Sequence, residues 1–170
     1  RKLLALEQAS NDGANLYSSG QEIVLESAPW LSVDTHQFDL AARNALRTGE
    51  VSKECLAAQY FEDAADAYSG AFLDGEDMEW IIVEREKLHA TYVRCLTELV
   101  RRYAILEQYE LAISAARRIL AADPFRESMQ RRLIVLLTLN GQRVQAIVEL
   151  RRWKAALRDE IGIDPMPETC

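Results

Sequence analysis

Glycine and proline are scarce in this chain, with 7 Gly and 4 Pro among 170 residues. Because both residues interrupt regular helices, their scarcity leaves long stretches free to form uninterrupted secondary structure. Hydrophobic residues make up 49% of the chain, which excludes a largely disordered segment. The chain is long enough to bury a substantial core, so we expect one or two compact domains.

Cysteine is equally rare, and long apolar runs are missing. Cys55, Cys95 and Cys170 are an odd set, widely separated and without a CxxC pair, so we expect a reducing cytoplasm rather than a disulfide framework. The longest uncharged apolar stretch, 133–142, is about half the length that crosses a bilayer. We therefore expect neither a membrane span nor a signal peptide.

An excess of basic charge is also lacking, because the formal net charge is −7. General attraction to phosphate needs a basic face, so any contact with DNA has to be local. The chain starts at Arg1 without an initiator Met and stops soon after Pro165 and Pro167. We expect it to be a piece of a longer protein.

Recognisable catalytic and ligand motifs are missing as well. Gly70 and Gly75 have the spacing of a phosphate-binding loop, but the acidic pair 76–77 stands where that motif needs Lys and Ser or Thr. His36 and His89 belong to no metal-ligand pattern, and no GxSxG nucleophile motif is present. The sequence therefore predicts no enzyme, no cofactor and no metal.

What the chain does contain is a repeat at an offset of 34 residues. The equivalent positions are Leu99 and Leu133, Tyr103 and Leu137, Ala112 and Ala146, Ile113 and Ile147, and Ile119 and Trp153. This is the length of a tetratricopeptide unit, a pair of antiparallel helices that buries its apolar face by stacking on its neighbours. The alternative explanation is that ordinary helical spacing of apolar residues imitates a repeat.

Start and stop signals place helices along most of the chain. Asp34, with Gln37 three residues later, is a helix start, Ser52 is a candidate cap, and the Asp-Pro pair at 123–124 suits the end of one helix and the start of the next. These signals predict helices over 34–49, 52–70, 78–106, 109–122, 124–140 and 143–162. The apolar face of the long third helix includes Trp80, and burial is the usual meaning of such a face.

The first part of the chain has a different pattern. Apolar segments at 15–17 and 22–25 flank Ser18, Ser19, Gly20 and Gln21, which predicts a short β-hairpin, and 31–33 is a third extended segment. The predicted fold class is thus mainly α, a tetratricopeptide-like antiparallel helical array with a short N-terminal β-hairpin.

One polar set on the predicted array is a candidate binding surface. Stacked tetratricopeptide units leave a concave groove between them. If Val93 and Glu127 are the first positions of two units, six residues lie on the helix faces that line this groove. They are Arg94, Thr97 and Arg101 in one unit, and Ser128, Arg131 and Val135 in the next. Arginine pairs with carboxylates through two donors, so this groove suits an acidic tail or helix. Alternatively, these are ordinary exposed residues paired with neighbouring glutamates.

Several motifs, taken in order, resemble a known family. They are VDTHQF at 33–38, AYSGAFL at 67–73, Trp80 with EREKL at 84–88, YELAI at 109–113, ADPFRE at 122–127, GQR at 141–143 and GIDPMPET at 162–169. Together they make residues 34–170 similar to the bacterial transcriptional activator domain of the Streptomyces antibiotic regulatory protein type. The chain departs from the pattern at Glu107, which stands where the next unit has Gly141, and in its acidic residues at 74, 76 and 77.

The resemblance implies that a winged-helix DNA-binding domain precedes the helical module. Residues 1–33 would then be the remnant of that domain, with 1–6 ending its recognition helix and the hairpin forming its wing, and 34–170 would be the activator domain. The implied DNA contacts are Arg1, Lys2, Ser18, Ser19 and Gln21. Most of the DNA-binding domain would be missing from this chain.

The function that the resemblance implies is a non-catalytic regulatory and protein-interaction module of a bacterial transcriptional regulator. Its expected partners are promoter DNA, through the mostly absent upstream domain, and a protein such as the transcription machinery, a sensor domain or a second copy in a homodimer. The alternative is a sensor or scaffold module in a multidomain signalling ATPase or cyclase-like protein that does not bind DNA.

Overall fold

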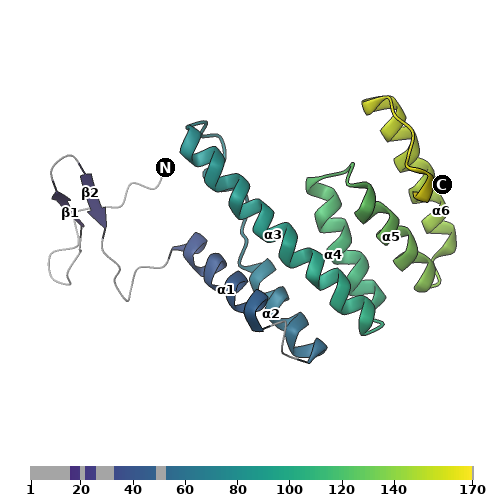
Figure 1. The fold of residues 1–170 in the computed structure, drawn as a ribbon, viewed down its shortest axis with the longest axis horizontal. Coiled ribbons are helices and arrows are strands. Elements are labelled where there is room, and N and C mark those ends of the chain that lie inside the picture. Colours follow the sequence, from purple (N-terminus) through teal and green to yellow (C-terminus); the bar gives the residue numbers. More distant parts are fainter. Residues whose placement is uncertain (1–15, 20–21, 26–32, 49–52, 170) are drawn as a thin grey trace. The chain divides into compact units, whose positions relative to one another are not determined.

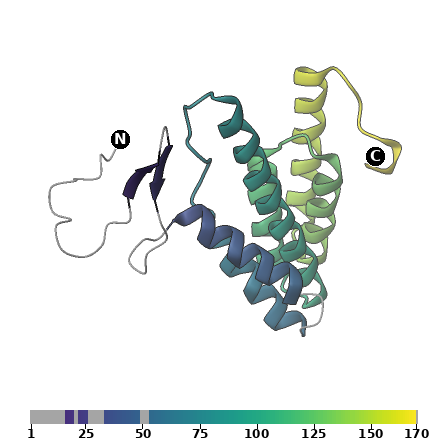
Figure 2. The same ribbon diagram turned by 60° about the vertical axis from the view of Figure 1, so that its left-hand side comes forward.

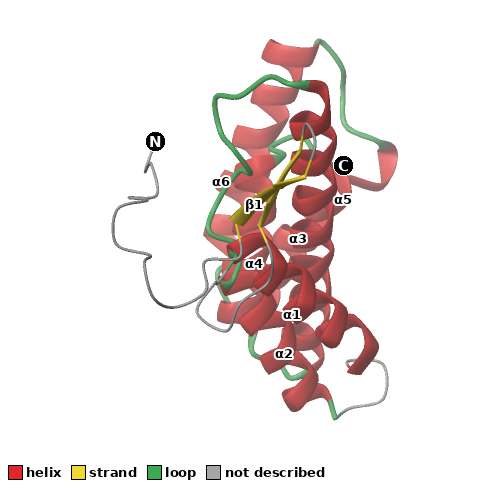
Figure 3. Ribbon diagram, turned by 90° about the vertical axis from the view of Figure 1, so that its left-hand side faces the viewer, coloured by secondary structure: helices red, strands yellow, loops and turns green. Residues whose placement is uncertain are grey.

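The computed structural model of the chain describes residues 16–19, 22–25, 33–48 and 53–169. The chain divides into two compact units, Arg1–Val33 and Asp34–Cys170, which we describe separately. In the first unit, strands β1 (Leu16–Ser19) and β2 (Glu22–Leu25) pair antiparallel, with Leu16 opposite Leu25 (Figure 3). Residues 31 and 32 of the expected third extended segment lie outside the described residues.

The second unit is helical. Its described residues form six α-helices: α1 (Asp34–Thr48), α2 (Glu54–Asp66), α3 (Glu79–Ile105), α4 (Tyr109–Ala122), α5 (Glu127–Leu139) and α6 (Arg143–Ala156). A π-helical turn (η1, Leu157–Ile161) and a 3₁₀ turn (η2, Pro167–Thr169) follow α6. Each helix packs on the next one along the chain, and α1 also contacts α3 (Figures 1 and 2). The prediction of a mainly helical chain is confirmed.

The 34-residue offset recurs in the backbone of the turns. After α3, the Gln108 N–H donates to the Tyr103 carbonyl, and after α5 the Gln142 N–H donates to the Leu137 carbonyl, both at 2.8 Å. The residue before each donor has a left-handed backbone, with φ of 58° at Glu107 and 75° at Gly141. The two helical pairs, α3 with α4 and α5 with α6, therefore turn in the same way.

The offset also recurs in the core, with one exception. Leu99, Tyr103, Ala112 and Ile119 are buried, and so are their equivalents Leu133, Leu137, Ala146 and Trp153. In the fifth pair, Ile113 is buried but Ile147 is 51% exposed. In the described array no helix follows α6 to cover this residue, so helical spacing alone could not predict its exposure.

Three details of the sequence prediction are wrong. Trp80 is 58% exposed rather than buried, because it lies in the first turn of α3, where its ring meets Phe72 edge to face. The fifth helix starts at Glu127 rather than at Pro124, since residues 124 and 125 form a turn after α4. The second helix ends at Asp66 rather than at Gly70, since residues 67–70 form a turn and loop. The last helix does extend as expected, because the π-helical turn continues α6 to Ile161 and ends at the left-handed Gly162.

Candidate functional site

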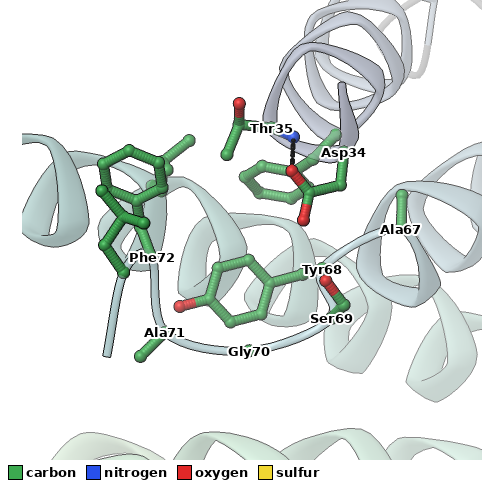
Figure 4. Close-up of a pocket in the computed structure, with 11 residues that line it drawn as sticks. Asp34, Thr35, Ala67, Tyr68, Ser69, Gly70, Ala71 and Phe72 are labelled. Carbon is green, nitrogen blue, oxygen red and sulfur yellow. Dashed lines mark hydrogen bonds between the residues drawn. The ribbon is translucent and has the colours of Figure 1, made fainter. Parts of the chain in front are cut away.

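A pocket of about 210 Å³ lies where α1 begins. Its walls are the first residues of α1 and the loop 67–73, and Phe38 and Leu88 also line it (Figure 4). The Asp34 carboxylate accepts a hydrogen bond from the Thr35 N–H at 2.7 Å, and Figure 4 shows the Tyr68 ring between Asp34 and the loop. The pocket thus combines an aromatic wall with one carboxylate.

Aromatic rings connect this pocket to the core. The Tyr68 ring stacks on Tyr92 with centroids 4.2 Å apart, and it meets the edge of Phe38 at 5.3 Å. Burial raises the pKa of the Tyr68 hydroxyl, and the neighbouring Tyr92 raises it further. The Tyr68 hydroxyl therefore stays protonated, and it supplies a neutral polar group rather than a base.

Arg85 holds the loop that borders this pocket. Its Nε donates to the Phe72 carbonyl at 2.8 Å, and its Nη2 donates to the Leu73 and Glu76 carbonyls at 2.6 and 2.8 Å. Leu73 has a left-handed φ of 44°, so one guanidinium stabilises a strained turn. The loop folds back on the hydrophobic core, because Phe72 packs against that core.

Two further arginines bridge distant helices, and neither was predicted from the sequence. Arg102 is 5% exposed and bonds to Glu54 of α2 at 2.7 Å. Arg118 donates to the Ala65 carbonyl at 3.1 Å and to the Tyr92 hydroxyl at 3.2 Å. Their partners are between 26 and 53 residues away in sequence, and local helical spacing cannot reveal such contacts.

The predicted groove residues lie on α3 and α5. Arg94, Arg101 and Ser128 are exposed, whereas Thr97 and Arg131 are half-buried. Arg101 bonds to Glu98 at 3.0 Å, and the Thr97 hydroxyl donates to the Val93 carbonyl at 2.7 Å. Within the described part of the chain, no hydrogen bond or ion pair engages Arg94 or Arg131.

The groove formed by these residues stays a prediction. The pairing of Arg101 with Glu98 matches the alternative of ordinary exposed pairs, and the other two arginines stay available. The pockets described here are lined by other residues. Of the predicted DNA contacts, Ser18 and Ser19 belong to β1, and Arg1, Lys2 and Gln21 lie outside the described residues.

A carboxylate on α5 fixes the C-terminal segment of the chain. One Glu127 oxygen accepts from the Met166 N–H at 2.8 Å and also from the Thr169 hydroxyl, which is buried. This contact joins residues about forty positions apart and brings together the ADPFRE and GIDPMPET motifs. Both motifs are visible in the sequence, but nothing local to either of them indicates that they touch.

Groups that support metal or thiol chemistry are not assembled in the described residues. They contain no cluster of three or more His, Cys, Asp or Glu side chains able to hold a metal ion. Cys55 is exposed, and burial raises the pKa of the buried Cys95 thiol to about 11, which keeps it protonated and unreactive. Among the helices of this part, none is long and apolar enough to cross a bilayer.

The helices from Asp34 onward form an array of consecutive helical pairs, which is the architecture of a helical-repeat domain. The model of the bacterial transcriptional activator domain family matches residues 33–170. The chain belongs to that family.

Similarity to individual proteins supports this family assignment. The chain is 25% identical over 136 residues to the transcriptional regulatory protein MoaR1 of Mycobacterium tuberculosis and to MoaR1 of Mycobacterium bovis, covering 79% of this chain and 43% of each relative. Its fold is similar to Mycobacterium tuberculosis EmbR, solved in complex with a low-affinity phosphopeptide, with a TM-score of 0.67 and 21% identity. That match covers 91% of this chain and 41% of EmbR, so the chain spans less than half of these proteins.

Proposed function

We propose that the chain is the non-catalytic regulatory and protein-interaction module of a bacterial transcriptional regulator. The observation that carries this proposal is the family match over 33–170, supported by similarity to MoaR1, which is a transcriptional regulatory protein. We infer that α3 with α4 and α5 with α6 are two tetratricopeptide-like units that present a binding surface.

In this proposal, DNA binding belongs to a winged-helix domain upstream of residue 34. Arg1, Lys2, Ser18, Ser19 and Gln21 are its last contacts with DNA in this chain. The formal charge of −7 gives the helical module little general attraction to phosphate. The parent protein would act on promoter DNA in the cytoplasm.

The helical module would hold a protein partner through the arginines of α3 and α5. Arg94 and Arg131 offer planar donors to carboxylates, with Thr97, Arg101 and Ser128 beside them in the repeat frame. An acidic segment is the partner chemistry that fits. It can belong to the transcription machinery, to a sensor domain or to a second copy of the chain.

A band-shift assay tests the division between the two domains. At a salt concentration of about 0.15 M, we expect the 170-residue chain alone to leave promoter DNA unbound and the parent protein to bind it. Replacing Arg1 and Lys2 together by Ala in the parent should weaken binding. A parent protein that shows no affinity for DNA would instead favour a sensor or scaffold module in a signalling protein.

A further inference from the structure

Gln130 is a buried polar residue whose side-chain nitrogen has no hydrogen-bond partner in the described part of the chain. It lies in α5, is 2% exposed, and its Nε2 is fully enclosed. An unpaired buried amide destabilises a fold, because the group has lost its bonds to water. A reason other than stability is therefore needed to explain why glutamine stands here.

The repeat shows what the fold accepts at this position. The residue 34 positions earlier is Leu96, which is fully buried in α3. The same comparison applies to Glu149 of α6. The residue 34 positions before it is Ala115 of α4, which is buried. Two positions that are small or apolar in the first helical pair are thus polar in the second, and departures of this kind concentrate at functional sites.

Gln130 and Glu149 line the same pocket. This pocket has a volume of about 380 Å³ and lies between the end of α4, the turn at Pro124 and Phe125, and α6. The volume lies within the range of small-molecule sites. Polar substitution and a cavity therefore coincide at one end of the array.

The lining restricts the chemistry of a ligand. The Trp153 indole N–H donates to the Pro124 carbonyl at 3.1 Å, which fixes the ring and uses its only donor. With the half-buried Phe125 it offers an apolar aromatic wall. The charged residues of the lining are Glu149, Arg152 and Glu160, so their sum of −1 disfavours an anion.

We propose that this pocket binds a neutral aromatic small molecule that carries an amide or a comparable donor and acceptor pair. The Gln130 amide has both a donor and an acceptor, so the ligand's polar group pairs with it while the aromatic body packs against Trp153 and Phe125. Rotation of the Gln130 side chain on binding turns the enclosed Nε2 toward the cavity, where the ligand supplies the partner that this nitrogen lacks.

Nuclear magnetic resonance on the ¹⁵N-labelled chain tests this with benzamide as the probe. The signals of the Trp153 indole N–H and the Gln130 side-chain amide should shift saturably, with a Kd on the order of 10 mM for so small a molecule. Benzoate, with the same ring and a negative charge, and acetamide, without a ring, should each bind at least about threefold more weakly.

Two variants test whether Gln130 is responsible for benzamide binding in this pocket. Gln130→Leu reproduces Leu96, so it should raise the Tm while weakening benzamide binding at least about threefold, and Ala156→Leu should block the pocket without changing Gln130. The proposal would be overturned if the signals show no saturable shift up to about 50 mM benzamide. Unchanged binding in both variants, or a lower Tm in Gln130→Leu, would overturn it as well.

Discussion

At single positions one helical pair carries a residue that suits the fold less well than the equivalent residue of the other pair. Glu107 and Gly141 occupy the same left-handed position after α3 and α5, but only glycine adopts that conformation without strain. In the core, Gln130 stands where the first pair has Leu96. These positions allow tests in which one unit of the repeat serves as the standard for the other.

Replacing Glu107 by Gly should stabilise the chain by about 0.5–1 kcal/mol, because the left-handed backbone is no longer strained. The reverse change, Gly141→Ala, should cost about 1 kcal/mol; a Cβ there would meet no atom within 4 Å, so the cost is conformational. Urea unfolding measures both. Arg117→Gly, exposed and inside α4, is the control and should destabilise by about 0.8 kcal/mol. A loss of stability in Glu107→Gly would contradict this account.

Stability should fall as the pH rises above about 9. Burial raises the pKa of Cys95 to about 11, while an unfolded thiol titrates near 8.5. Between these values the unfolded chain loses the proton and the folded chain keeps it, so the free energy of unfolding falls with rising pH. We expect Cys95→Val to remove about 1–2 kcal/mol of the loss between pH 8 and 10. Equal pH dependence in both proteins would show that Cys95 is not responsible.

Elements differ in how firmly they are attached. α3 packs against α1, α2 and α4, whereas the main packing partners of α6 in the described structure are α5 and the π-helical turn η1. Ala146 and Trp153 are the residues that α6 buries among those described. The last helix and the segment after it therefore depend on a few specific contacts.

Trp153→Ala should cost about 3–5 kcal/mol, because the indole fills the interface of α6 and holds the Pro124 carbonyl. Trp153→Phe keeps an aromatic ring but loses the hydrogen bond, so it should cost only about 1–2 kcal/mol. Chemical denaturation followed by circular dichroism gives both values. A cost near zero for the alanine variant would mean that the assigned repeat register is wrong.

Glu127→Ala should release the C-terminal segment without unfolding the helices. The variant removes the acceptor of the Met166 N–H, so hydrogen exchange at that amide should speed up by about tenfold or more, while α4 amides stay protected. Glu168→Ala, at a neighbouring exposed carboxylate, is the control and should change neither rate. Unchanged exchange at Met166 in Glu127→Ala would contradict the role of Glu127.

At the scale of the whole molecule, the sequence predicted what depends on local pattern. Helices 34–49, 78–106 and 109–122 agree with α1, α3 and α4 within one residue at each end, because caps and apolar spacing are local signals. The buried Trp153 followed from the repeat. The contacts of Arg102 with Glu54 and of Glu127 with Met166 could not be predicted, since they depend on how distant helices pack.

The central claim, that the helical module serves a protein partner rather than DNA, is tested most directly in the parent regulator. We expect Arg94→Ala with Arg131→Ala to leave promoter binding unchanged in a band-shift assay and to impair activation in a transcription assay, because both side chains face a partner in our proposal. If this double variant abolishes DNA binding, or if it activates transcription as well as the unmodified regulator, the claim is wrong.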